Sequence, residues 1–143
     1  MTAAMIRKVA HIGIAVKSLE ERIPFYRDVL GLKFEGIQDL PARGLRLAVF
    51  GAGGAHIELL QGTRPDATIS TFIEQRGEGI HHIAFDVDDA AAMLARLSGS
   101  GIRALDPVPR DGAGGAKIVF LDPHDTGRVL MELVQKNGPK PGK

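Results

Sequence analysis

Hydrophobic and polar positions alternate along several short stretches of the chain, which is the pattern of strands that bury one face. These stretches lie near residues 8–16, 33–39, 44–50, 55–61, 80–87, 102–107, 116–120 and 129–135. Two other stretches carry apolar residues at helical spacing, one from about Leu19 to Leu30 and one from Asp88 or Asp89 to Leu97. The sequence therefore predicts an α+β fold.

Several residues mark where these helices begin and end. Ser18 and Glu21 have capping-box spacing ahead of the first helix, and Gly31 lies just beyond its end. Pro24 is unfavourable inside this helix, so we expect the helix to begin only shortly before it. In the second helix Met93 belongs to the apolar stripe, and we expect it in the core rather than in a metal site.

The chain also repeats itself, with a period of about half its length. Residues 11–16 match residues 82–87, and residues 57–61 match residues 131–135. Each half reads as a strand, a helix and about three further strands, which is a βαβββ module. Two such modules, packed side by side, predict one curved, mixed sheet of eight strands around a central cup.

This repeat sets the expected organisation of the chain. We expect a single domain over residues 1–143, with modules at about 8–61 and 79–135. Residues 62–78 would form a linker, and the Pro-, Gly- and Lys-rich residues 137–143 a frayed tail. The glycine-rich segments 51–54 and 112–115 resemble hairpin turns, because neither contains a phosphate-loop motif or opens a helix.

Strand alternation directs four polar side chains toward the predicted cup. His11 and His82 alternate with small residues, and Glu58 and Glu132 lie on the face opposite their large apolar neighbours. Two imidazoles and two carboxylates suit one divalent ion, such as cobalt, nickel, manganese or zinc, and two carboxylates buried without a cation would be costly. We therefore predict a metal site formed by His11, Glu58, His82 and Glu132.

The other three histidines fit this pattern less well. His81 lies on the face opposite His82 and has no counterpart in the first half of the chain, where Ala10 takes its place. We therefore expect a structural role for His81. His56 and His124 sit beside turns, where we expect them to be exposed.

Composition narrows the range of partners. The chain is 44% hydrophobic and 24% charged with a net charge of +1, which gives no sign of a nucleic-acid interface. It has no cysteine, which excludes disulfides, thiolate zinc sites and a cysteine nucleophile. No apolar run is long enough to span a bilayer, and the first residues lack a signal-peptide pattern, so we expect a cytoplasmic protein without a membrane partner.

Longer motifs resemble a known superfamily. Residues 25–31, which read Phe-Tyr-Arg-Asp-Val-Leu-Gly, are similar to a marker of the vicinal oxygen chelate superfamily, also called the glyoxalase fold. That resemblance extends from about Val9 to Gln135. A narrower resemblance is to the methylmalonyl-CoA epimerase family, through residues 57–60, 66–72, 77–84, 120–123 and 129–133. The run Gly-Glu-Gly-Ile-His-His at 77–82 is the most specific of these motifs.

The chain departs from this family at three places. Asp122-Pro123-His124 stands where the family usually has His-Pro-Lys, and residues 112–115 read Gly-Ala-Gly-Gly in place of Gly-Ala-His-Gly. Some bacterial members carry an additional glutamate in the strand around residues 45–48, together with a glutamine as the third ligand. This chain has no glutamate there and has Glu58 where those members have the glutamine, which leaves the second catalytic base open.

The resemblance implies a metal-dependent epimerase that interconverts (2R)- and (2S)-methylmalonyl-CoA. The proton at C2 would be removed and returned through a metal-stabilised enediolate. The family's ligands map onto His11, Glu58, His82 and Glu132, and its catalytic glutamate maps onto Glu132, with Glu58 as the candidate for the second base. The expected partners are an acyl-CoA substrate and a second copy of the chain in a homodimer.

Other members of the superfamily provide alternatives. Lactoylglutathione lyase (glyoxalase I), which acts on the hemithioacetal of methylglyoxal and glutathione, uses a similar His/Glu/His/Glu set. A non-catalytic small-molecule binding protein of the bleomycin-resistance type is the second alternative, although such proteins generally lack the four ligands. A dioxygenase with two histidines and one glutamate is disfavoured, because a fourth carboxylate would crowd the oxygen site.

Overall fold

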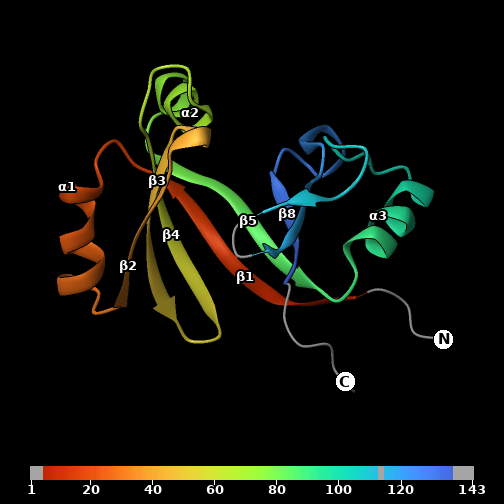
Figure 1. Ribbon diagram of the computed structural model, residues 1–143, viewed down its shortest axis with the longest axis horizontal. Helices are drawn as coiled ribbons and strands as arrows, with labels where there is room; N and C mark the ends of the chain where they lie inside the picture. Colours follow the sequence, from red (N-terminus) through yellow and green to blue (C-terminus); the bar gives the residue numbers. More distant parts are fainter. Residues whose placement is uncertain (1–4, 113–114, 137–143) are drawn as a thin grey trace. The chain divides into compact units, whose positions relative to one another are not determined.

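The chain divides into two compact units. The computed structural model describes residues 5–112 and 115–136. One unit, here the N-terminal unit, spans residues 11–82, and the other, the C-terminal unit, combines residues 1–10 with residues 83–143. Strands β1 (Ile6–Ala15) and β5 (Gly79–Val87) each contribute residues to both units (Figure 1).

Four strands of the N-terminal unit lie in the order β2-β3-β4-β1. The first three are β2 (Lys33–Leu40), β3 (Leu45–Ala52) and β4 (Ala55–Gly62). Strand β3 is antiparallel to both of its neighbours, whereas β4 is parallel to β1. The glycine-rich turn predicted at 51–54 is confirmed as the β3–β4 hairpin, with Gly53 at a φ of 69°.

The first predicted helix changes its hydrogen bonding at Pro24. Helix α1 (Leu19–Pro24) is followed by a π-helical turn (Phe25–Val29), in which the N–H of Leu30 donates to the carbonyl of Phe25 at 2.9 Å. Because proline has no N–H, the regular α-helical ladder cannot continue unchanged through this point. The single helix predicted to Leu30 was therefore wrong in detail.

The predicted helix boundaries are confirmed at the residues that mark them. Ser18 Oγ accepts a hydrogen bond from the Glu21 N–H at 3.2 Å, and Gly31 has a left-handed φ of 77°. In the C-terminal unit, helix α3 (Ala90–Gly99) begins after Asp89, whose carboxylate accepts from the Ala92 N–H at 3.0 Å.

Each face of the sheet in the N-terminal unit packs against a different helix. Helix α1 covers a cluster built from Val16, Leu19, Ile23, Ala48, Phe50 and Leu59. Helix α2 (Thr68–Arg76) covers the other face, where Ile69 packs with Ala15, Leu45, Leu47 and Leu60. Helix α2 lies inside residues 62–78, which the sequence predicted to be a linker. The helix was not predicted because its apolar residues show only weak helical periodicity.

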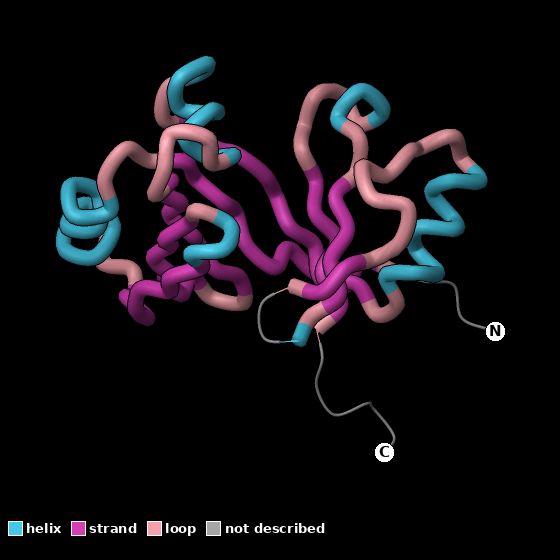
Figure 2. Tube along the Cα trace, turned by 45° about the horizontal axis from the view of Figure 1, so that its top comes forward, coloured by secondary structure: helices cyan, strands magenta, loops and turns pink. Residues whose placement is uncertain are grey.

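In the C-terminal unit the strand order is β5-β8-β7-β6, which continues the order of the other strands into one eight-stranded mixed sheet. The new strands are β6 (Arg110–Asp111), β7 (Lys117–Phe120) and β8 (Met131–Gln135). Strand β8 is parallel to β5, and β7 is antiparallel to both β8 and β6. Helix α3 lies beside the strands of this unit (Figure 2) and packs against β7 and β8. Met93 is buried there with Val119 and Leu133, as predicted.

The strand predicted at 102–107 was wrong. Only Ala104 forms a bridge, to Leu121, and the edge strand is the two-residue β6 at Arg110. Pro107 and Pro109 account for this difference, because proline cannot donate a ladder hydrogen bond.

Two further expectations concern other parts of the chain. The second glycine-rich turn includes residues 113 and 114, and the frayed tail comprises residues 137–143; both lie outside the described residues. Among the described helices, none is long and apolar enough to cross a membrane.

Candidate metal centre

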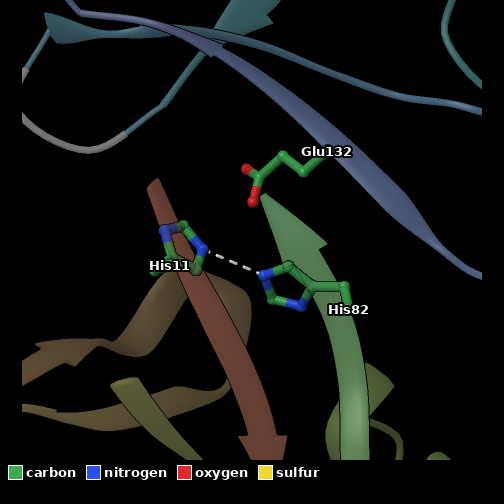
Figure 3. A group of neighbouring side chains, drawn as sticks. All are labelled: His11, His82 and Glu132. Carbon is green, nitrogen blue, oxygen red and sulfur yellow. Dashed lines mark hydrogen bonds between the residues drawn. The ribbon is translucent and has the colours of Figure 1, made fainter. Parts of the chain in front are cut away.

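Three of the four predicted ligands lie together in the structure. His11 on β1, His82 on β5 and Glu132 on β8 each offer a ligand atom, and these atoms all lie within 4.8 Å of one another. Figure 3 shows the three side chains directed toward a common point. His82 and Glu132 are buried, each with 7% of its surface exposed. A buried carboxylate beside two imidazoles is a donor set that suits a divalent cation.

The register of the strands explains how each glutamate reaches its histidine. In the N-terminal unit Gly13, two residues after His11, stands opposite Glu58 on the parallel strand β4. In the C-terminal unit Ala84, two residues after His82, stands opposite Glu132 on the parallel strand β8. Since side chains two residues apart share a face of a strand, both halves present a histidine and a glutamate in the same relationship.

The two histidine rings face each other closely. Their Nε2 atoms are 3.0 Å apart, and the rings meet edge-on with centroids 5.1 Å apart. Gly13 makes this approach possible, because a Cβ atom at residue 13 would lie 2.7 Å from His82 Nδ1. The small residue predicted beside the histidine therefore serves to leave room for the second imidazole. This space and the donor set both fit a bound metal ion.

Glu58 stands at the other side of His11. Its Oε2 lies 3.6 Å from His11 Nδ1, which is beyond the usual length of a hydrogen bond. The three-residue group does not include Glu58, and the assignment of this residue as the fourth ligand stays a prediction. From this position the carboxylate can either join a shared cation or orient the His11 ring.

His81 contacts the predicted ligand His82, and the sequence did not predict this contact. Its Nδ1 lies 2.9 Å from His82 Nδ1, and its ring packs edge-on against Phe72 of α2, with centroids 5.0 Å apart. Adjacent strand residues point to opposite faces, so alternation alone gave no reason to expect this contact. His82 therefore directs Nε2 toward His11 while His81 contacts its other ring nitrogen, as partners of metal-binding histidines commonly do.

The remaining histidines lie outside the three-residue group. His124 is 80% exposed in its side chain, as predicted. His56 is only partly exposed, because it pairs with Glu35, with Nε2 and Oε1 3.2 Å apart. Asp122, which replaces the usual histidine of the 120–123 motif, accepts hydrogen bonds from the backbone and the ring of His124 and caps the short turn Pro123–Asp125. These hydrogen bonds also lower the pKa of Asp122 below its ordinary value.

Similarity to known proteins identifies the superfamily of this chain. Residues 8–128 match the model of the Glyoxalase/Bleomycin resistance protein/Dioxygenase superfamily. The chain belongs to this superfamily. Its eight-stranded mixed sheet is accordingly the fold expected from the motifs.

Relatives narrow the family further. The chain is 37% identical to an uncharacterized protein, YqjC, of Bacillus subtilis, over 93% of this chain and 95% of the relative. It is 35% identical to the mitochondrial methylmalonyl-CoA epimerase of Mus musculus, over 90% of this chain and 72% of the relative. A solved structure of a methylmalonyl-CoA epimerase in complex with methylmalonyl-CoA and NH4+ matches at a TM-score of 0.86 and 34% identity, covering 94% of this chain and 97% of that one.

Proposed function

We propose that this protein is a methylmalonyl-CoA epimerase, which interconverts the (2R) and (2S) epimers of the thioester. The observation that carries this proposal is the group of His11, His82 and Glu132, in a chain whose epimerase relatives cover it almost completely. The solved complex with methylmalonyl-CoA supports an acyl-CoA as the substrate class.

The residues that would hold a divalent ion are His11, His82 and Glu132, with Glu58 as the proposed fourth ligand. Nitrogen and carboxylate donors of this kind accept cobalt, nickel, manganese or zinc. When bound, such an ion would supply Lewis-acid stabilisation of the negative charge that develops on the substrate oxygens.

Glu132 is the proposed residue that takes the proton from C2. The C–H bond breaks, its electron pair forms a double bond between C2 and the thioester carbon, and the carbonyl π pair moves onto the thioester oxygen, while the carboxylate of Glu132 becomes a carboxylic acid. A proton must then return to C2 on the opposite face to invert the centre. Glu58, which belongs to the other half of the repeat, is the proposed donor of that proton.

The decisive experiment compares two substrates in heavy water. Metal-loaded protein is incubated with methylmalonyl-CoA, and separately with methylglyoxal and glutathione. Deuterium incorporation at C2 and equilibration of the epimers with the first substrate are the expected results. Turnover of only the second substrate would show a lactoylglutathione lyase, and turnover of neither would favour a binding protein.

A cytoplasmic location and a homodimer complete the proposal. The superfamily commonly dimerises, and size-exclusion chromatography with light scattering tests the assembly directly. Imaging of a tagged full-length chain in its source cells tests the location, which matters because the mouse relative is named as mitochondrial.

A further inference from the structure

An arginine outside the metal ligands lies on the same face of the C-terminal unit as Glu132. Arg110 on β6 stands opposite Ile118 on β7, and Phe120, two residues further along β7, stands opposite Glu132 on β8. Directly opposed residues of antiparallel strands point to the same side, as do residues two apart on one strand. Arg110, Phe120 and Glu132 therefore share one face across three neighbouring strands.

The Arg110 side chain leans toward the row that contains Glu132. Its guanidinium carbon lies 5.8 Å from the centroid of the Phe120 ring, although the backbone of Arg110 is in register with Ile118. Attraction between the cation and the ring face fixes the guanidinium over Phe120. One strand spacing, about 4.8 Å, separates the backbones of Phe120 and Glu132.

In this position the guanidinium of Arg110 can still donate hydrogen bonds to a ligand. Its Nε pairs with Asp106 Oδ2 at 3.4 Å, and the Arg110 side chain is 54% exposed. An exposed ion pair of this kind is weak, and a guanidinium has five N–H donors in a planar fork. The fork matches the two oxygens of a carboxylate.

The substrate of the proposed function carries a carboxylate, which is the kind of group that this fork binds. The free carboxyl carbon of a methylmalonyl thioester is bonded directly to C2, and a base that removes the C2 proton must come within about 3 Å of that hydrogen's carbon. Two carboxylates, one from the substrate and one from Glu132, are then held close together, and a nearby cation offsets their repulsion.

We infer that Arg110 binds the free carboxylate of the substrate and so selects CoA thioesters of α-carboxylated acids over neutral acyl-CoA molecules. This inference rests on the proposed function. It assigns to Arg110 a role in substrate binding, separate from the metal ligands and from proton transfer.

Binding measured by calorimetry with two ligands tests the inference. Wild-type protein and the Arg110→Gln variant are each titrated with methylmalonyl-CoA and with propionyl-CoA, which lacks the carboxylate. Loss of a charged hydrogen-bond pair predicts at least about tenfold weaker binding of methylmalonyl-CoA to the variant. Binding of propionyl-CoA should be unchanged, and Arg110→Lys should recover only part of the loss, because an ammonium lacks the fork.

Asp106→Asn is the matched control, since it breaks the ion pair and keeps the arginine. Unchanged affinity for methylmalonyl-CoA in this variant supports the inference, whereas a loss equal to that of Arg110→Gln would overturn it and assign a structural role to the pair. Equal weakening of both ligands by Arg110→Gln, or no weakening, would also overturn it. Epimerase activity of the wild-type protein is measured alongside, so that failure of the proposed function is recognised separately.

Discussion

The His82 ring lies directly over Gly13, so close that a Cβ atom at residue 13 would stand 2.7 Å from Nδ1. Gly13→Ala should therefore displace the buried imidazole from its position opposite His11. We expect metal affinity to fall by about 10–100-fold, in line with the loss of an orienting contact around a metal ligand. Competition with a metal-sensitive dye measures the affinity, and circular dichroism verifies the fold. Gly79→Ala is the control, because Gly79 lies on β5 with His82 and a Cβ there would meet nothing within 4 Å.

A second prediction concerns the contact between His81 and His82. His81→Phe retains a ring against Phe72 but removes the Nδ1 atom that lies 2.9 Å from His82 Nδ1. We expect about tenfold or greater loss of metal affinity with little loss of stability, because His81 would no longer help to orient the His82 ring. His124→Phe changes an exposed ring and should leave affinity unchanged. Equal affinities in the two variants would contradict the role of His81.

Exchange and inversion at C2 separate the two proposed bases. Glu132→Gln should reduce deuterium incorporation by about 100-fold or more in the epimer whose C2 proton faces Glu132, since a positioned base typically contributes that much. Glu58→Gln should instead stop inversion while one epimer continues to exchange its proton through Glu132. Metal content of both variants is measured first, so that a lost ligand is not mistaken for a lost base. Exchange by Glu132→Gln at the wild-type rate would exclude Glu132 as the base.

The free energy of unfolding tests the prediction that Met93 belongs to the hydrophobic core. Met93 lies on the buried face of α3 and is 7% exposed, and Met93→Ala should lower the free energy of unfolding by about 2–5 kcal/mol. Leu105→Ala, at a residue that is 56% exposed, should change it by less than about 0.5 kcal/mol. Urea denaturation gives both values, and a large effect of Met93→Ala on metal affinity without a loss of stability would argue against a core role.

Asp125 contributes to the pH dependence of stability at acid pH. Arg103 donates to this carboxylate through its side chain and its backbone N–H, which lowers the pKa of Asp125 from 3.8 to about 2. A depressed folded-state pKa means that the stabilisation is present above about pH 4 and is lost as the pH falls through about 2. Carboxyl NMR titration should show a pKa for Asp125 near 2, returning toward 3.8 in Arg103→Gln. A wild-type value near 3.8 would contradict this.

The repeated strands and the faces of their residues could be predicted because alternation is a local property of the chain. Val16 is buried and Ile14 partly buried beneath α1, on the face opposite His11, as that alternation predicts. The repeat then selected Glu132 and His82, and the structure brings both beside His11. The proposed ligand set needed no knowledge of long-range packing beyond the repeat itself.

Features that depend on particular tertiary contacts could not be predicted from the sequence. The ring of His81 reaches His82 because α2 places Phe72 against it, and α2 itself carries no strong apolar stripe. The short edge strand at Arg110 replaced a longer predicted strand because two prolines precede it. The position of Arg110 over Phe120 could not be predicted either, because the sequence did not show that Arg110 belongs to a strand or which residue of β7 it stands opposite.

The facing pair of His11 and His82 has a consequence for folding. These histidines are the first and last residues of the N-terminal unit and are separated by 71 positions in the chain. Bringing the ends of such a loop together costs on the order of 4 kcal/mol in chain entropy, so this contact is expected to form late, after the strands between have paired. The contact between the two Nε2 atoms thus joins the two ends of this unit. We expect it to form only when the chain between the two histidines has folded.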